Sequence, residues 1–353
     1  MSKRTLDGFF APKGKKPKLD EPSVPLTPTT NSSHPTYPFP IPNLPPEVTS
    51  EFEMLVTAEG KSMTDQPHLD LLYFQPFIPR PCSTTYFHFL RSQLPFYRVI
   101  YTISRFGKET VINTPRWTTV FGVDDTSLFT PTGTLIEASP ATNNNNADPR
   151  PIARDKYKCR PRPIPECLDL LRRVTEAATD TQYNFCLVNY YASGTDSISF
   201  HSDDERFLGL NPAIASFSLG ARRDFLMKHK PPPPPPPPAK EGAQASAGDT
   251  AAAAAAAAAA TPTTRPIKMP LGSGDMVLMR GETQSNWLHS IPKRTGKGAE
   301  AERGRINITF RRARVVGGTE NYYRYNVGEG PVHRWDASRR EMGVWKGEAG
   351  TGG

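Results

Sequence analysis

Three residues of the 353-residue chain have the types and the spacing of a metal site. His201 and Asp203 stand two positions apart, and side chains at i and i+2 of an extended strand point to the same side. Two histidines and one carboxylate on one face are typical of an Fe(II) site with open positions. His289, in a later strand-like segment, is the best candidate for the second histidine. Because an H-x-D pair also arises by chance, and a lone histidine is more often a surface or core residue, other segments must support the site.

The segment from Arg305 to Arg311 gives that support. Its residues alternate with a period of two, which predicts a strand with Ile306, Ile308 and Phe310 on one face and Arg305, Asn307, Thr309 and Arg311 on the other. The planar fork of arginine suits carboxylates, so two arginines on one face suit a small dianion. The alternative is a solvated edge strand. Asn189 and Tyr191 repeat the same spacing on another strand-like segment, as small-molecule donors or as ordinary polar positions of a sheet.

Two helices and seven strands are expected to position these residues. Apolar residues at spacings of three and four predict one helix through Ile164, Leu168, Leu171 and Val174, and another through Phe87, Leu90 and Leu94 with Ser83 and Thr84 as N-caps. The expected strands are residues 184–191, 197–201, 213–219, 224–229, 275–279, 287–291 and 305–311. This pattern predicts an all-β core with flanking helices, of the α+β class, built as a sandwich or barrel.

Proline marks two low-complexity segments. Of the 38 prolines, 11 lie in residues 1–50 and 10 in residues 231–266. The first segment is expected to be a disordered tail, and the second to be a loop between two strands. Residues 51–317 are expected to form one domain interrupted by that loop. The composition of residues 318–353, with Gly-rich ends and five aromatics, does not settle whether this segment is ordered.

The charge balance favours a polyanionic partner. The chain has 43 Lys and Arg against 35 Asp and Glu, a formal net charge of +8, but six basic and two acidic residues in the first 20 supply half of it. No apolar run approaches the ~20 residues of a membrane span, and the N-terminus lacks the apolar core of a secretory signal. We therefore expect no membrane association, a reducing compartment, and four cysteines that are free thiols.

Together these motifs resemble the AlkB family of iron- and 2-oxoglutarate-dependent dioxygenases, from about residue 70 to residue 315. The motifs that match, in chain order, are N-x-Y at 189–191, H-x-D at 201–203, His289 and R-x-N-x-x-x-R at 305–311. The string SLGARRDF at 218–225 and the acidic string DDE at 203–205 are similar to the eukaryotic DNA-repair branch of that family. The fold that this resemblance implies is a double-stranded β-helix, or jelly roll.

The resemblance also implies the cofactors and their ligands. Fe(II) would be bound by His201, Asp203 and His289, with 2-oxoglutarate as cosubstrate and O2 as oxidant. The residues with cosubstrate roles would be Arg305 and Tyr191 at the distal carboxylate, Arg311 and Asn189 near the metal end, and Asn307 within the same motif. The implied reaction is oxidative demethylation of N-alkylated DNA bases such as 1-methyladenine and 3-methylcytosine, with release of formaldehyde and succinate.

A hairpin is expected between residues 97–103 and 109–112, with Arg105, Phe106, Gly107 and Lys108 at its tip. A base inside a duplex must leave the stack to reach the metal, and an aromatic wedge flanked by cations is suited to fill the gap. The DNA-repair branch has a similar Phe-Gly-Lys hairpin, with an apolar residue where this chain has Arg105. The alternatives for Phe106 are an ordinary exposed tip and a core position.

Three further residues are expected to contact the nucleic acid. Asp204 is expected to meet the base or its exocyclic amine, and Arg223 and Lys230 are expected to meet phosphates. The alternative for Arg223 is a solvated charge.

The N-terminal tail carries two partner motifs. Leu6, Phe9 and Phe10 are spaced to form one apolar plug that resembles the clamp-binding box of PCNA partners, although Lys3 stands where such boxes usually have Gln. A basic cluster follows, suited to nuclear import, at Lys13, Lys15, Lys16 and Lys18. We therefore expect a nuclear monomer that acts on alkylated DNA, as a duplex, and that binds the PCNA sliding clamp.

Other functions stay open at this point. The same oxygenase chemistry on RNA or on a protein side chain is one alternative, and a non-catalytic nucleic-acid reader or scaffold is another. The non-catalytic reader or scaffold is disfavoured because all three metal-ligand positions and both arginines are present. A zinc hydrolase would also use His and Asp ligands, but it gives no reason for the two arginines of the 305–311 strand.

Overall fold

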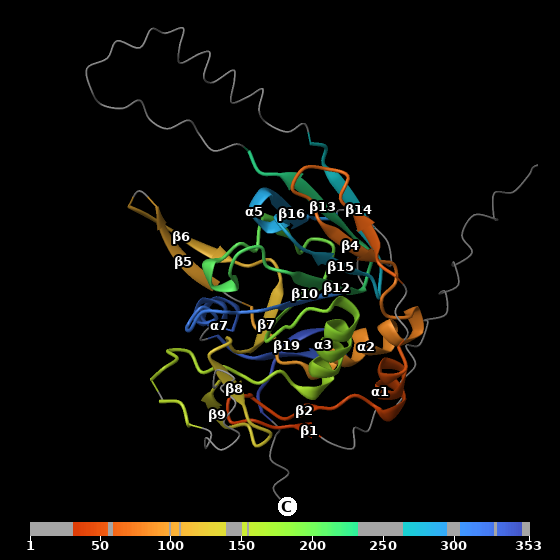
Figure 1. The fold of residues 1–353 in the computed structure, drawn as a ribbon. Coiled ribbons are helices and arrows are strands. Elements are labelled where there is room, and N and C mark those ends of the chain that lie inside the picture. The colour runs from red at the N-terminus through yellow and green to blue at the C-terminus, as the bar shows by residue number, and fades with distance from the viewer. Residues whose placement is uncertain are drawn as a thin grey trace, which may run out of the picture.

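Two antiparallel sheets and a layer of helices form the fold of this computed structural model (Figure 1). The residues that it describes are 31–55, 59–98, 100–105, 107–138, 150–153, 155–231, 264–294, 304–327 and 330–347. The larger sheet has the strand order β3 (Lys61–Met63), β4 (Leu71–Phe74), β15 (Met276–Met279), β12 (Ile214–Gly220), β17 (Arg305–Arg311), β10 (Phe185–Tyr191) and β7 (Trp117–Gly122). The smaller sheet has the order β11 (Ile198–His201), β16 (Trp287–Ile291), β13 (Arg223–His229) and β14 (Ile267–Leu271).

The chain passes back and forth between the two sheets. It runs from β10 in the larger sheet to β11 in the smaller one, returns for β12, crosses for β13 and β14, and alternates again through β15, β16 and β17. All strand pairs of both sheets are antiparallel. This is the winding of a double-stranded β-helix, so the predicted fold class and all seven predicted strands are confirmed.

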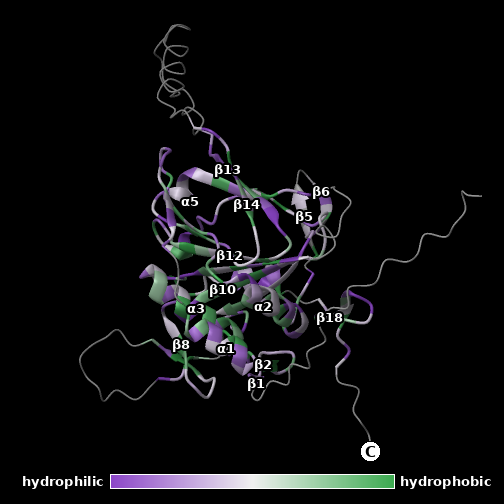
Figure 2. Cartoon of the chain, turned by 90° about the vertical axis from the view of Figure 1, so that its right-hand side faces the viewer, coloured by the Kyte–Doolittle hydropathy of each residue, from purple (hydrophilic) through white to green (hydrophobic). Residues whose placement is uncertain are grey.

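Three helices cover the outer face of the larger sheet: α1 (Pro46–Glu53), α2 (Arg80–Gln93) and α3 (Glu166–Thr179) (Figure 2). Both predicted helices are present as α2 and α3. The predicted caps of α2 are wrong: the N-cap is Pro79, four residues before Ser83, and the hydroxyls of Ser83 and Thr84 donate to the carbonyl of Arg80 inside the first turn. Pro81 explains the earlier start, because a proline ring presets the helical φ in the first turn.

The domain begins earlier than the composition predicts. The segment before residue 51 contains β1 (Asn31–Ser32), β2 (Ile41–Pro42) and most of α1, and Ile41 is completely buried in the helix layer. The Tyr37 hydroxyl donates to the carbonyl of Pro163 at 2.6 Å. The expectation of a tail over residues 1–50 is therefore wrong from residue 31 onward, where apolar residues occur often enough to pack.

The segment after residue 317 also packs on the domain. It contains α7 (Glu320–Asn326) and a two-stranded ribbon of β18 (His333–Asp336) and β19 (Glu341–Val344). Tyr323 is buried, and Phe96 and His333 exchange backbone hydrogen bonds of 3.0 and 2.7 Å. Hydrogen bonds from Thr118 to Asn326 and from Tyr323 to Gly122 place α7 beside the larger sheet, next to β7.

The expected hairpin forms from β5 (Ile100–Arg105) and β6 (Lys108–Asn113) and projects from the body of the domain (Figure 1). Arg105 pairs with Lys108, so the loop has two residues, and Gly107 takes a φ of 74° that favours glycine. The remaining elements are β8 (Ser127–Phe129), β9 (Leu135–Glu137), the 3-10 helix η1 (Arg206–Leu208) and α5 (Thr283–Asn286).

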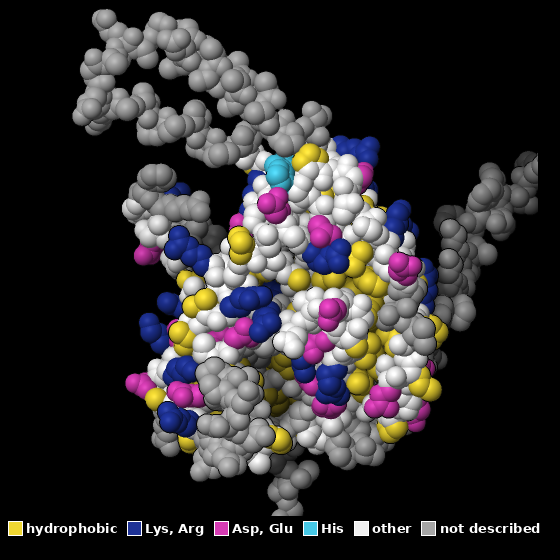
Figure 3. Space-filling view, in the orientation of Figure 1, with side chains coloured by type: hydrophobic (Ala, Val, Ile, Leu, Met, Phe, Trp, Pro, Cys, Tyr) yellow, Lys and Arg dark blue, Asp and Glu magenta, His cyan; other side chains and the backbone are white. Residues whose placement is uncertain are grey.

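The other composition-based expectations concern cysteine, charge and membranes. All four cysteines are unpaired, as predicted. Lys and Arg side chains are mixed with Asp and Glu over the face seen in Figure 3. Among the described helices, none has the length and apolarity to cross a membrane.

The strand β17 lies in the interior of the larger sheet, between β12 and β10, and all seven of its residues are buried. Its apolar side chains enter the helix layer, and its polar side chains face the space between the two sheets. This excludes the alternative of a solvated edge strand.

Candidate active site

The three predicted metal ligands come together between the sheets. His201 ends β11 and pairs in register with His289 of β16, while Asp203 follows β11 by two residues. One donor atom from each of the three lies within 4.8 Å of the others, the only such group among the described residues. Nε2 of His289 is 3.8 Å from Oδ2 of Asp203, and the two imidazole centroids are 4.2 Å apart.

Neighbouring groups orient each of these side chains. Nδ1 of His201 is 2.9 Å from the carbonyl oxygen of Ser199, which leaves Nε2 for a metal. The Asp203 backbone N–H donates to Oε1 of Gln284 at 2.9 Å. The ring of Phe225 stacks on that of His289 with centroids 5.3 Å apart. The donor set is therefore held in place by the protein itself.

Burial and charge prepare these groups to bind a cation. Burial alone would raise the pKa of Asp203, but the Arg311 guanidinium and the two imidazoles outweigh it and lower that pKa. Burial, aided by His201, lowers the pKa of His289 to about 3. At neutral pH the carboxyl is therefore ionised and the His289 ring neutral, the forms in which both groups bind metals.

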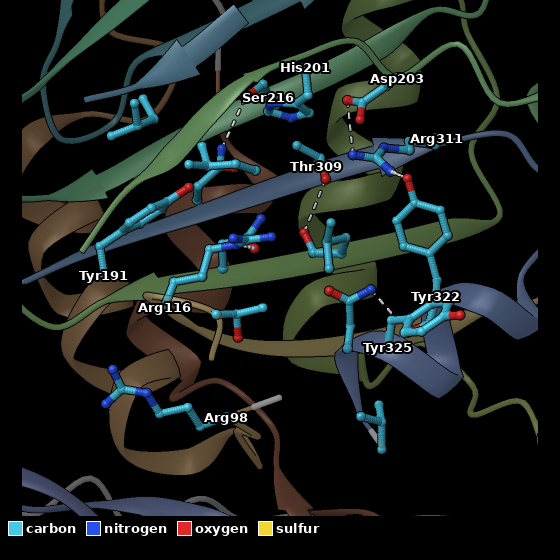
Figure 4. Close-up of a pocket in the computed structure, with 18 of the residues that line it drawn as sticks. Arg98, Arg116, Tyr191, His201, Asp203, Ser216, Thr309, Arg311, Tyr322 and Tyr325 are labelled. Atoms are coloured by element: carbon cyan, nitrogen blue, oxygen red, sulfur yellow. Dashed lines mark hydrogen bonds and ion pairs between the residues drawn. The ribbon is translucent and has the colours of Figure 1, made fainter. Parts of the chain in front are cut away.

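A cavity of about 850 Å³ opens beside the triad (Figure 4). The polar face of β17 forms its floor, and Asn189 and Tyr191 of β10 extend it because they pair in register with Asn307 and Arg305. The two polar motifs that the sequence analysis singled out on separate strands are thus side by side.

Arg305 carries an unpaired donor in this cavity. Its side chain is 1% exposed, its Nε–H donates to the Ser218 hydroxyl at 2.7 Å, and its guanidinium lies 5.3 Å from the centroid of the Tyr191 ring. Burial lowers its pKa to about 10. Its Nη1 is buried and has no hydrogen-bond partner among the described residues. A buried cationic donor without a partner suits the carboxylate of a ligand.

Arg311, six residues on, has partners for two of its three guanidinium nitrogens. Its Nη2–H donates to Oδ2 of Asp203 at 2.9 Å, and its Nη1–H donates to the Tyr322 hydroxyl at 2.5 Å. Its Nε is buried without a partner in the described part of the chain. Arg305 and Arg311 thus each have one buried guanidinium nitrogen left for an anion, and the triad is left for a cation. This donor set fits 2-oxoglutarate and Fe(II).

The two asparagines are held by other groups. Oδ1 of Asn189 accepts from Nε of Arg116 at 2.9 Å. Nδ2 of Asn307 donates to the Ser216 hydroxyl at 3.0 Å and to the carbonyl of Phe217 at 2.8 Å. Both residues line the cavity, with their amides fixed by these contacts.

Two residues that were expected to contact nucleic acid, Arg223 and Asp204, instead bind groups of the domain itself. Arg223 is 4% exposed and donates to the carbonyls of Asp196 and Pro292 at 2.8 and 2.6 Å, so the expected phosphate contact is wrong: the guanidinium is used inside the domain. Asp204 pairs with Lys230 at 2.6 Å and does not line the cavity, whereas its neighbour Glu205 does.

Other predicted residues cannot be placed in the site. Phe106 lies outside the described residues, and only the backbone of Arg105 is described. Gly107 and Lys108 are at the exposed hairpin tip. The clamp-binding motif of Leu6, Phe9 and Phe10, and the basic cluster after it, also lie outside the described residues.

Sequence reasoning missed several residues of the cavity wall, including Arg98, Arg116, Glu205, Tyr322 and Tyr325. Glu205 was visible as the last member of the acidic string at 203–205. Tyr322 and Tyr325 belong to α7, and no periodicity in their segment indicates that it returns to the site. Figure 4 shows Tyr322 pointing at Arg311, with Asp203 on the other side of that guanidinium.

Comparison with known proteins agrees with this geometry. A relative in Arabidopsis thaliana, "DNA oxidative demethylase ALKBH2", is 32% identical over 69% of this chain and 66% of its own length. The mouse "Alpha-ketoglutarate-dependent dioxygenase alkB homolog 3" is 33% identical over 46% of this chain and 48% of its own. The human "DNA oxidative demethylase ALKBH2" is 32% identical over 43% and 48%. The matches thus span about half the length of the two mammalian relatives and 66% of the plant relative.

A solved structure, "The structure of OsALKBH1", aligns with 71% of this chain at 16% identity and a TM-score of 0.36, too low to bear on the fold. A family model described as "2OG-Fe(II) oxygenase superfamily" matches residues 135–311, half of the chain, and includes the triad and both arginines. The chain therefore belongs to the 2OG-Fe(II) oxygenase superfamily, within the eukaryotic branch of its AlkB family.

Proposed function

We propose that the chain is an oxidative demethylase that repairs N-alkylated bases in DNA, with 1-methyladenine and 3-methylcytosine as substrates. The observation that carries this proposal is the shared cavity of the His201, Asp203 and His289 triad and the two arginines with free buried N–H groups. Fe(II), 2-oxoglutarate and O2 would supply oxidation of the N-methyl group, which leaves as formaldehyde while 2-oxoglutarate becomes succinate and CO2.

In this reaction the residues of the chain would bind 2-oxoglutarate and orient the metal ligands. Arg305 would bind the distal carboxylate of 2-oxoglutarate through its free Nη1, beside Tyr191. Arg311 would hold Asp203 in its ligating orientation and offer its Nε to the metal end of the cosubstrate, with Asn189 nearby in the cavity. Both arginines are buried, so bulk water does not compete strongly for their charge.

Glu205 supports a base with an exocyclic amine as the substrate. Its Oε1 accepts from Tyr322, but its Oε2 is buried beside the cavity with no hydrogen-bond partner among the described residues. An acceptor left in that state costs free energy until a donor reaches it. Adenine and cytosine both present an amino group at the edge that alkylation modifies, and thymine does not.

The cavity mouth supports a nucleic-acid substrate. Arg98, Arg116 and Arg324 line the cavity, and Ile100 and Thr102 place the β5–β6 hairpin along the same wall. Guanidiniums at that position suit the phosphates beside a flipped base. We propose that the hairpin residues Arg105 to Lys108 bind duplex DNA. We also propose that the Leu6 to Phe10 motif binds the PCNA clamp. The protein would act as a monomer in the nucleus.

The test is product release from a defined substrate. Purified protein with Fe(II) and 2-oxoglutarate is incubated with a duplex oligonucleotide carrying one 1-methyladenine, beside the same strand unpaired and an RNA copy. We expect equal amounts of formaldehyde and succinate and an unmodified adenine, all lost in His201→Ala. Succinate without base repair would move the substrate elsewhere, and release only from RNA would make the protein an RNA demethylase. No iron-dependent turnover would favour a reader or scaffold.

A further inference from the structure

The helix α7 lies outside the residues that match the oxygenase family, yet one of its side chains reaches the metal site. The family match ends at residue 311, and α7 follows nine residues later. Two hydrogen bonds fasten α7 to β7: the Thr118 hydroxyl donates to the carbonyl of Asn326 at 2.5 Å, and the Tyr323 hydroxyl to that of Gly122 at 2.7 Å. The helix is therefore a fixed part of the cavity wall.

The ring of Tyr322 is held between aromatic neighbours. Its centroid lies 5.3 Å from that of Phe185 and 5.7 Å from that of Phe207, both edge-on. Such contacts favour one ring orientation. The hydroxyl is thereby directed at Arg311, as Figure 4 shows.

The hydroxyl of Tyr322 joins the metal-ligand side of the cavity to the substrate side. It accepts from Nη1 of Arg311 and donates to Oε1 of Glu205, each at 2.5 Å, while Nη2 of Arg311 donates to Asp203. The hydrogen bonds run in one direction, from Arg311 outward, and no donor or acceptor is used twice. Removing this hydroxyl would leave the buried Arg311 and the half-buried Glu205 each short of one partner.

We propose that Tyr322 is a positioning residue of the active site, which acts through Arg311 to orient Asp203 for the metal and the free Nε for 2-oxoglutarate. The inference rests on the proposed function only in that metal and cosubstrate must bind here. A long guanidinium side chain with a single anchor can rotate, and Tyr322 supplies the second anchor. The C-terminal segment thereby contributes to a site whose three metal ligands and two arginines lie within residues 135–311.

Tyr322→Phe tests this role, because it keeps the ring and removes only the hydroxyl. Mn(II) affinity, and 2-oxoglutarate affinity of the Mn(II)-loaded protein, are measured by calorimetry. We expect both to weaken about tenfold, the usual effect of removing a group that orients a metal ligand. Tyr323→Phe, the neighbouring substitution on the same helix, is the matched control and is expected to lower the melting temperature while keeping both affinities.

A double-mutant cycle with Arg311→Lys separates positioning from general loosening of the fold. If Tyr322 acts through Arg311, its removal costs little affinity once Arg311 is already replaced. The inference is overturned if folded Tyr322→Phe binds both ligands like wild type, if Tyr323→Phe weakens them equally, or if the two effects add. If the wild-type protein binds neither ligand, the proposed function fails and this inference fails with it.

Discussion

The two faces of β17 differ in what their burial accomplishes. Ile306, Ile308 and Phe310 are fully buried against the helix layer, which is built from apolar side chains. On the opposite face Arg305 and Arg311 are buried almost as deeply, but in a polar cavity and with donors left unpaired. One face gains free energy from apolar burial, and the other retains groups whose burial costs free energy until a ligand arrives. We therefore expect substitutions on the first face to affect stability and substitutions on the second to affect binding.

The largest effect is expected at Asp203. Asp203→Asn removes a metal ligand and the anionic partner of Arg311, so we expect it to abolish formaldehyde release and Mn(II) binding. Asp204→Asn, one residue on, breaks only a half-exposed pair with Lys230 and should change the free energy of unfolding by less than about 1 kcal/mol. Equal Mn(II) affinity in the two variants would show that the triad is not the metal site.

Phe310→Ala is the opposite case on the same strand. Truncating this fully buried ring is expected to lower the free energy of unfolding by about 3–5 kcal/mol, measured by urea denaturation. The folded fraction should bind 2-oxoglutarate as wild type does, because the ring faces away from the cavity. A weakened affinity in the folded protein would mean that the two faces are not separable.

Arg305→Met is expected to weaken ligand binding and to leave stability unchanged or higher, the reverse of Phe310→Ala. The substitution removes a buried cation with an unpaired donor, so the free energy of unfolding should stay constant or rise, as when other buried ionic groups are replaced by apolar ones. We expect 2-oxoglutarate affinity, measured by calorimetry with Mn(II), to fall about 10- to 100-fold. Unchanged affinity would place the distal carboxylate elsewhere.

The pH dependence of the metal-free protein gives the smallest effect. The pKa of His289 is about 3 when folded and near its ordinary value when unfolded, so below that ordinary value the unfolded chain binds a proton that the folded chain does not. Stability is therefore lost as the pH falls, by about 2 kcal/mol between pH 7 and pH 5. Urea denaturation with a chelator present measures this loss. His289→Gln should reduce the change of stability with pH. An unchanged pH dependence in this variant would contradict the lowered pKa of His289 as its cause.

The sequence predicts the central strands and the triad because their patterns are local. Period-two alternation defines β17 and places its arginines on one face, and H-x-D needs only an extended strand. The strand β14 was missed because Pro270 lies inside it. A proline is tolerated there because β14 is an edge strand of the smaller sheet.

Long-range contacts explain what the sequence could not predict. Arg223 directly precedes the predicted strand 224–229, but its guanidinium turns inward to carbonyls around residues 193–196 and 292. Tyr322 reaches residues more than a hundred positions earlier, at Glu205 and, through Arg311, at Asp203. The spacing of nearby residues predicts neither contact, because each depends on how separate segments pack.

The most direct test of the difference between the two faces is a crystal structure with Mn(II) and 2-oxoglutarate, obtained without oxygen. We predict the metal on His201, Asp203 and His289, and the distal carboxylate of 2-oxoglutarate on the free Nη1 of Arg305. A metal bound elsewhere, or a cosubstrate that leaves Arg305 unpaired, would contradict the assignment of the polar face of β17 as the binding face.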